Sequence, residues 1–164
     1  MSKFNDIARD IINTRIYKKM KGYIQHGNTS CYKHCIEVSY KSYIVSKKLN
    51  KIFNLNLDEK SIIRASLLHD FFLYDWHYLP KEKNLFKKHG FTHPEIALKN
   101  AKKYFDINNL EEDIILNHMW PLTFYRFPKY KETYMVLLID KYCTLNEIVH
   151  NLLTKQILID KLQN

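Results

Sequence analysis

The sequence is poor in the two residues that most often make tight turns, with only 3 glycines and 4 prolines among 164 residues. An all-β fold needs many tight turns, whereas long helices need few. Hydrophobic residues make up 46% of the chain, which is enough for a packed core. The composition therefore predicts a globular protein built mostly from helices, as a single domain over residues 1–164.

Long hydrophobic runs are also missing. No apolar stretch approaches the roughly 18 residues that span a bilayer. The first ten residues, MSKFNDIARD, lack the apolar core and the cleavage site of a signal peptide. The 3 cysteines, Cys31, Cys35 and Cys143, form no CxxC pair. We therefore expect a cytoplasmic protein with reduced thiols and no membrane partner.

Basic residues outnumber acidic ones, and the formal net charge is +9. Such a charge favours phosphate-bearing partners. The lysines are nevertheless spread along the whole chain and do not gather in one basic stripe. A nucleic-acid-binding surface is therefore not expected.

Apolar residues recur at three- and four-residue steps over most of the chain, which is the period of an amphipathic helix. The pattern predicts an all-α fold, a single orthogonal bundle of about six or seven helices. The expected helices lie at about 3–25, 30–49, 59–70, 93–104, 109–118, 131–149 and 151–162, the last of them covering the core. The expected N-caps are Thr29 or Ser30, Asp58, and Thr92, with Pro94 in the following first turn.

One segment, RASLLHDFFLYDW at residues 64–76, places His69 and Asp70 at the end of an apolar helix. Two titratable groups are costly there unless they pair or bind a metal ion. At a helix end both side chains can turn toward one point, whereas within a helix they would diverge by about 100°. The dipeptide alone is explained more simply by a His–Asp hydrogen bond that closes the helix.

Further ligand-type residues fall on inward faces or at helix ends elsewhere in the chain. Asp140 lies four residues after Val136 and three before Cys143, so it faces inward, where an unpaired carboxylate is costly. Each such residue alone is explained as an ordinary core side chain. Together they predict a site for a divalent transition metal, one or two ions of Mn, Fe, Co, Ni or Zn. The six predicted ligands are His34, His69, Asp70, His93, His118 and Asp140.

The order of His34, His69-Asp70 and Asp140 resembles the HD-domain superfamily of metal-dependent phosphohydrolases, over about residues 30–145. His93 in HPEIA and His118 in NHMWP resemble the histidines of members that bind two metal ions. The segments LLHDFFLYDW, HGFTHPEIALKNA and HMWPLT are similar to a subgroup of small bacterial HD-domain hydrolases, which supplies no substrate to carry over. The GYP motif of the HD-GYP members is absent, so cleavage of cyclic di-GMP is not expected.

The resemblance implies how the ligands would be divided between two metal ions. His34, His69, Asp70 and Asp140 would hold the first ion. Asp70 would bridge to a second ion held by the remaining two histidines, His93 and His118. His89, four residues before His93, is an alternative or additional ligand.

The resemblance also implies hydrolysis of a phosphomonoester or phosphodiester, such as a nucleotide, by a metal-activated hydroxide. Such a reaction needs cations and hydrogen-bond donors around the phosphate. The catalytic candidates are Asp70, Asp75, His77 and Lys141; the candidates for substrate binding are His89, Trp120, Arg126 and Lys129. Each has an ordinary alternative as a cap, a surface charge or a packed loop side chain.

Two other functions remain open from the residues. One is a regulatory HD module that binds a nucleotide without turnover. The other is a di-iron oxygenase, since some di-iron HD proteins activate dioxygen and the residues present do not exclude it. The partner expected in the first case is a small-molecule phosphoester, and a homo-oligomer is compatible with every reading.

Overall fold

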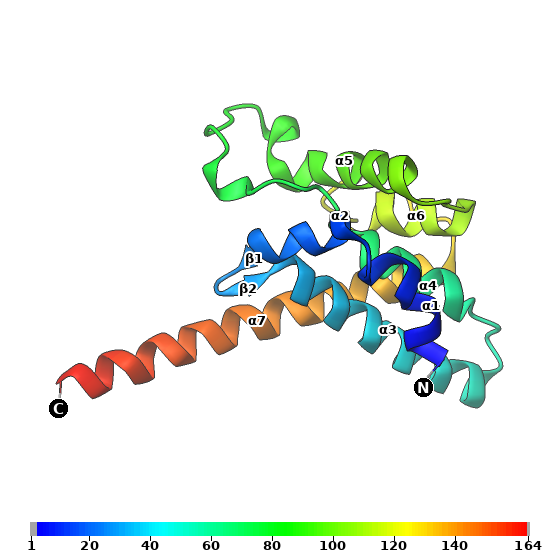
Figure 1. The fold of residues 1–164 in the computed structure, drawn as a ribbon, viewed down its shortest axis with the longest axis horizontal. Coiled ribbons are helices and arrows are strands. Elements are labelled where there is room, and N and C mark those ends of the chain that lie inside the picture. The colour runs from blue at the N-terminus through cyan, green and yellow to red at the C-terminus, as the bar shows by residue number, and fades with distance from the viewer. Residues whose placement is uncertain (1–2, 164) are drawn as a thin grey trace.

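The computed structural model describes residues 3–163, with side chains over residues 3–155. This part contains seven α-helices, three short 3₁₀ helices and a two-stranded sheet, which confirms the predicted all-α bundle (Figure 1). The helices are α1 (Lys3–Ile12), α2 (Arg15–Lys18), α3 (Cys31–Phe53), α4 (Glu59–Leu68), α5 (His89–Tyr104), α6 (Asn109–Asn117) and α7 (Lys131–Gln163). The remaining elements are η1 (Lys19–Gly22), β1 (Ile24–His26), β2 (Thr29–Ser30), η2 (Trp76–Tyr78) and η3 (Leu85–Lys87).

Helix α4 is central, because it contacts α1, α3, α5, α6 and α7. Its residues 61–68 are all buried. The carboxylate of Asp58 caps its first turn, as predicted, and accepts hydrogen bonds from the backbone N–H groups of Lys60 and Ser61. The helix ends at Leu68, so His69 and Asp70 leave it in the middle of the bundle.

The first predicted helix, 3–25, is wrong in its extent. Helix α1 ends at Ile12, and the hydroxyl of Thr14 accepts a hydrogen bond from the N–H of Tyr17 to start α2. Apolar periodicity continues across this break, because Tyr17 and Met20 are still buried against the core. The chain then turns into the β1–β2 hairpin, which the periodicity did not indicate.

The hairpin lies against α7, and its turn requires a glycine. Gly27 has a φ of +58°, and a Cβ atom there would lie 2.0 Å from the side-chain amide nitrogen of Asn151. Strand β1 of the same hairpin places the Gln25 side chain in the interior. Ser30 then caps α3, as one of the two predicted N-caps, by accepting from the N–H of Lys33.

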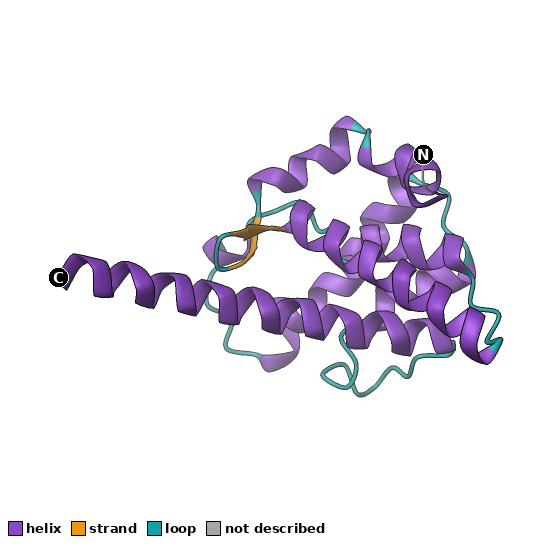
Figure 2. Cartoon of the chain, turned by 90° about the horizontal axis from the view of Figure 1, so that it is seen from below, coloured by secondary structure: helices purple, strands orange, loops and turns teal. Residues whose placement is uncertain are grey.

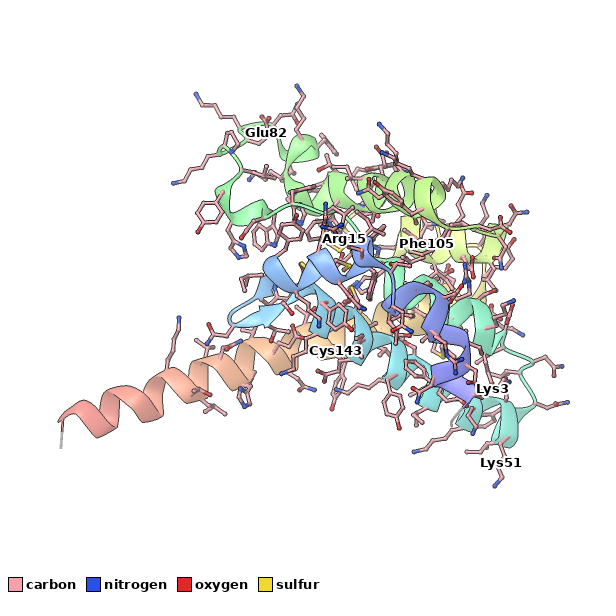
Figure 3. All side chains as sticks on the ribbon, in the orientation of Figure 1. Lys3, Arg15, Lys51, Glu82, Phe105 and Cys143 are labelled. Carbon is pink, nitrogen blue, oxygen red and sulfur yellow. The ribbon has the colours of Figure 1, made fainter. Side chains whose placement is uncertain are left out.

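The two helices predicted at 131–149 and 151–162 are a single helix, α7. No glycine or proline interrupts residues 131–163, and the Asn151 side chain donates to the carbonyl of Glu147 instead of ending the helix. Cys143 marks the part that lies along the body beside α3 (Figure 3). The far half extends beyond the body in both views (Figures 1 and 2). Leu152 and Leu153 there are exposed, so the predicted cover over the core is wrong as far as residue 155, and the side chains after it lie outside the described part.

Helix α5 begins at His89, earlier than the predicted N-cap at Thr92. Pro94 therefore sits inside the helix, where it removes one hydrogen bond, the one that its missing N–H would make to the carbonyl of Gly90. Residues 69–88 before it are irregular apart from η2 and η3, and the part that carries η2 and η3 lies away from the body in Figure 1.

The three cysteines are free and buried, as expected for reduced core thiols. Among the described helices, none combines the length and the hydropathy needed to cross a membrane.

Candidate metal centre

His69 and Asp70 lie at the C-terminal end of α4, and both are buried. The Nδ1 atom of His69 lies 2.7 Å from the carbonyl oxygen of Ser66, three residues earlier. A carbonyl oxygen only accepts hydrogen bonds, so Nδ1 carries the proton. The ring therefore directs Nε2, the nitrogen that can bind a metal ion, into the bundle.

Two more histidines follow the same local rule. His118 ends α6, and its Nδ1 donates to the carbonyl of Ile115 at 2.8 Å. His93 lies in α5, and its Nδ1 donates to the carbonyl of His89 at 2.9 Å. In each case the hydrogen bond from Nδ1 fixes the tautomer and the orientation of the ring. It leaves Nε2 as the atom that can coordinate a metal ion, as is usual for metal-binding histidines.

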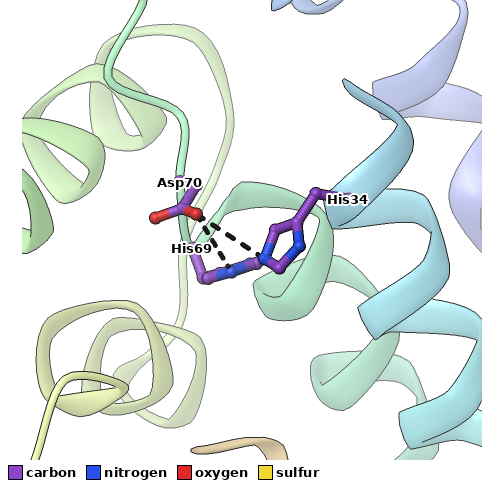
Figure 4. Close-up of side chains that lie close together, drawn as sticks. All are labelled: His34, His69 and Asp70. Atoms are coloured by element: carbon purple, nitrogen blue, oxygen red, sulfur yellow. Dashed lines mark ion pairs between the residues drawn. The ribbon is translucent and has the colours of Figure 1, made fainter. Parts of the chain in front are cut away.

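Three ligands of the first group, His34 from α3 and His69 and Asp70 from the end of α4, lie close together (Figure 4). The Asp70 Oδ2 atom lies 3.4 Å from His69 Nε2 and 3.8 Å from His34 Nε2. From α7, Asp140 Oδ1 lies 3.0 Å from His34 Nε2 and 3.4 Å from His69 Nε2. Four predicted ligands thus converge from three helices.

The second group uses the other oxygen of the same carboxylate. Asp70 Oδ1 lies 3.2 Å from His93 Nε2 and 3.6 Å from His118 Nε2. The two Nε2 atoms are 2.9 Å apart. The residues of this group could hold a metal ion, and so could His34, His69 and Asp70 of the first group.

The donor atoms fit a metal ion in their spacing and in their lack of other partners. A bond of about 2.0–2.1 Å to each donor places neighbouring donors roughly 3.0–3.4 Å apart, close to the observed distances. His69 Nε2 and Asp70 Oδ1 are buried without a hydrogen-bond partner. A buried acceptor that faces only other acceptors is costly, and a cation among them removes that cost.

The electrostatics of the cluster also favour a cation. Burial opposes the charged form of Asp70, but the surrounding imidazoles of His69, His118 and His93 outweigh it and hold its pKa well below the usual range. The pKa of Asp140 is likewise lowered by His34 and His69 despite burial. Burial lowers the pKa of His34, but the carboxylates of Asp140 and Glu147 outweigh it and raise the value to about 10. The carboxylates therefore remain charged and attract positive charge.

Two buried residues at the site were missed by sequence reasoning. Glu147 Oε1 lies 3.0 Å from His34 Nδ1 and accepts a hydrogen bond from it. Glu147 thus orients this ring as the helix carbonyls orient the other three. Glu147 follows Asp140 by seven residues, which places both on one face of α7, and this spacing could have revealed it. Gln25 donates to Asp70 Oδ2 at 2.5 Å from the hairpin, and no helical pattern could have revealed it.

A cavity of about 890 Å³ adjoins the metal centre. Asp70, Asp140, His93 and His118 contribute to its lining. Lys141, one of the predicted catalytic residues, also lines it and donates to the carbonyl of His118 at 3.3 Å. The centre is thus accessible to a small molecule.

His89 lines the same cavity but lies outside both ligand groups. Its Nδ1 forms a 3.1 Å hydrogen bond with the hydroxyl of Tyr74, and its ring stacks on that of His93 at 4.7 Å. Burial, followed by the neighbouring His93, lowers the pKa of His89 to about 3. His89 therefore lies beside the centre as a neutral imidazole, and His93 is the one among the ligand atoms.

Asp75 and His77 pair with each other away from the cavity lining. Asp75 caps η2 by accepting from the His77 backbone N–H, and its carboxylate lies 3.0 Å from His77 Nδ1. The ring of Trp120 lies against Phe127 and Tyr134, also outside the lining. The structure does not bring these three predicted residues to the metal centre.

Arg126 and Lys129 line a different cavity of about 600 Å³, together with Asp113 and Asn117. Arg126 forms an ion pair with Glu95, and the backbone N–H of Lys129 donates to Asp113. Neither side chain lines the cavity beside the metal centre. Of the predicted substrate-binding residues, His89 alone does so.

Comparison with known proteins yields no match for this chain among family models, curated proteins or solved structures.

Proposed function

We propose that the chain is a metal-dependent phosphohydrolase related to the HD-domain superfamily, acting on a small phosphate ester. One observation carries the proposal: the two oxygens of Asp70 face two different sets of imidazoles. Oδ2 faces His34 and His69, and Oδ1 faces His93 and His118. A carboxylate in this position bridges two cations, which is the arrangement of two-metal phosphoryl-transfer sites.

In this proposal His34, His69, Asp70 and Asp140 hold one divalent transition-metal ion, and Asp70, His93 and His118 hold the second. The ions, when bound, lower the pKa of a bound water to about 7 and neutralise charge on the phosphate. Asp70 would contribute one oxygen to each ion, since it belongs to both sets. Gln25 holds the Oδ2 atom of Asp70 in place.

Overall, the water oxygen forms a new bond to phosphorus and the ester P–O bond breaks. The alcohol leaves with a proton; inorganic phosphate remains from a monoester, and a phosphomonoester remains from a diester. Lys141 and Lys88 line the cavity and supply the positive charge that an incoming phosphate needs. His89 borders the same space without occupying a ligand position. The buried free thiols fit the cytoplasmic location that we propose.

The test is hydrolysis by protein loaded separately with Mn, Fe, Co, Ni or Zn, measured as phosphate release from phosphomonoesters and as alcohol release from phosphodiesters. The proposal predicts release that is lost on chelation and restored by metal. Retention of a nucleotide without turnover supports a regulatory module instead. Oxygen uptake by the iron-loaded form, with no phosphate release, supports a di-iron oxygenase.

A further inference from the structure

The cavity beside the metal centre has two kinds of wall. One is the cluster of charged and imidazole side chains already described. The other is apolar and comes from residues 119–122, from η2 and from the middle of α7. Its side chains are Trp76, Met119, Pro121, Leu122, Leu145 and Ile148. A ligand that reaches the metal centre must therefore also contact hydrocarbon.

The apolar wall is open to solvent in the free protein. Leu145 is 60% exposed, Leu122 42% and Ile148 41%. Exposed aliphatic groups that line a cavity next to a reactive centre are covered most favourably by apolar parts of a ligand, since that removes both surfaces from water. The wall thus selects for an apolar group.

The cavity offers few groups to recognise a nucleobase. Trp76, an aromatic ring in its lining, already stacks on His77 at 3.9 Å and on His89 at 5.1 Å between ring centroids. Gln25 has both of its amide atoms engaged, with Asp70 and with the thiol of Cys31. In the part of the chain that the structure describes, His26 and Thr144 are the other polar side chains of the lining outside the metal centre and the two lysines. A base would therefore place most of its polar edge against hydrocarbon, which leaves hydrogen-bonding groups unpaired.

The positive charge in the lining suits one phosphate group. Among the described side chains, Lys88 and Lys141 are the lysines or arginines that line this cavity. A phosphate monoester carries about −2 at neutral pH. Each further phosphate would add negative charge that these two lysines do not balance. Arg126 and Lys129 cannot balance it either, because they line the other cavity.

We infer that the site takes a phosphate monoester of an apolar alcohol, aliphatic or aromatic, with its hydrocarbon group along Leu122, Leu145 and Ile148. This inference rests on the proposed function and narrows its substrate class. It differs from the nucleotide that the sequence led us to expect, and a nucleoside monophosphate therefore serves as the competing ligand in the test.

The test measures binding separately from turnover. Calorimetry on the full-length, metal-loaded protein gives the affinity for n-alkyl phosphonates from methyl to hexyl, which lack the ester bond. Burial of each methylene contributes about 0.8 kcal/mol, so we expect affinity to rise about fourfold per added methylene. We also expect hexyl phosphonate to bind more tightly than adenosine monophosphate, and hexyl phosphate to be hydrolysed faster than that nucleotide.

Two leucines of α7 supply a matched pair of variants. Leu145 lines the cavity and is 60% exposed, whereas Leu152 lies outside the lining and is 62% exposed. In Leu145→Asn we expect the affinity to rise less than about twofold per added methylene. In Leu152→Asn we expect it to rise about fourfold, as in the unaltered protein. Because both positions are exposed, both variants are expected to fold, which circular dichroism checks.

Three results overturn the inference. They are an affinity of the unaltered protein that does not rise with alkyl chain length, an equal rise per methylene in the two variants, and tighter binding of adenosine monophosphate than of hexyl phosphonate. If nucleoside monophosphates are hydrolysed faster than alkyl phosphates, the inference fails and the proposed hydrolase stands. If the phosphonate series has the expected slope but no ester is hydrolysed, the apolar binding preference stands and the hydrolase proposal fails.

Discussion

The Nε2 atoms of His93 and His118 face each other at 2.9 Å while the Nδ1 atom of each ring donates to a backbone carbonyl. With Nδ1 protonated, each neutral ring presents a lone pair at Nε2. Two lone pairs at this distance repel unless a cation or a shared proton lies between them. Asp70 Oδ1 lies 3.2 Å and 3.6 Å from the same two atoms, which makes a cation the natural occupant.

Asp70→Asn should weaken metal binding by both ligand groups, because Asp70 belongs to each of them. The amide keeps the shape of the side chain but loses the negative charge, and it presents an N–H₂ group to one set of imidazoles. We expect bound metal to fall below one equivalent and phosphate release to fall at least about a hundredfold, with the helical content unchanged.

Asp75→Asn is the matched control, because Asp75 caps η2 and lies outside the cavity lining. It should retain the metal content and the activity of the unaltered protein within about twofold. Full metal occupancy in Asp70→Asn would exclude Asp70 as the shared ligand.

Glu147→Gln should weaken one metal site selectively. The glutamine oxygen can still accept from His34 Nδ1, but the charge that polarises the ring is lost. Partners of this kind typically contribute 10- to 100-fold to metal affinity, so we expect about a tenfold loss, confined to the ion that His34 would hold. Competition with a chromogenic chelator measures both sites. Glu37→Gln, on the exposed side of α3, is the control, and an equal loss at both sites would contradict the assignment.

Metal uptake at neutral pH should release protons. In the metal-free fold the pKa of His34 is raised to about 10 and that of His69 is raised well above its usual value, so both rings are charged at pH 7. A metal ion needs their lone pairs and displaces the protons. We expect about two protons per chain in a weakly buffered solution with an indicator dye. Apparent affinity should rise with pH, and uptake without acidification would contradict this account.

Arg64→Met tests the stability of the fold around α4, the helix that ends at the metal ligands His69 and Asp70. Arg64 is buried in α4, where it donates to Glu111 at 2.7 Å and to the Asp106 carbonyl at 2.8 Å and pairs with Asp10. Methionine would leave the buried Glu111 without its cation, at a cost of about 3 kcal/mol in the free energy of unfolding. Urea denaturation measures it. Lys3→Met, which breaks the exposed pair with Glu59, should cost less than about 1 kcal/mol.

The interior helices were predictable because their sequences satisfy several rules at once. Helix α4 has a capping aspartate, a mostly apolar stretch and a polar pair at its end, and these signals agree on its boundaries. The break after Ile12 was not predictable from periodicity, since buried side chains continue beyond it and only the Thr14 hydroxyl marks the new start. The predicted break between residues 149 and 151 does not occur, and the Asn151 side chain donates to the Glu147 carbonyl within the continuous helix.

The candidate ligands could be predicted because a titratable side chain on an inward helical face needs a partner. The residues around them could not be predicted equally well. Gln25 reaches Asp70 from a hairpin, and its role depends on the fold of the whole chain. Trp120 and Arg126 belong to the segment after α6, whose conformation places Trp120 against Phe127 and Arg126 at a different cavity.

Elemental analysis of the purified protein after reconstitution tests the central claim most directly. The account predicts two equivalents of a divalent transition metal per chain, and one equivalent in His118→Ala, which removes a ligand of the second group alone. A protein that takes up no metal from Mn, Fe, Co, Ni or Zn would contradict the account, as would a His118→Ala variant with an unchanged metal content.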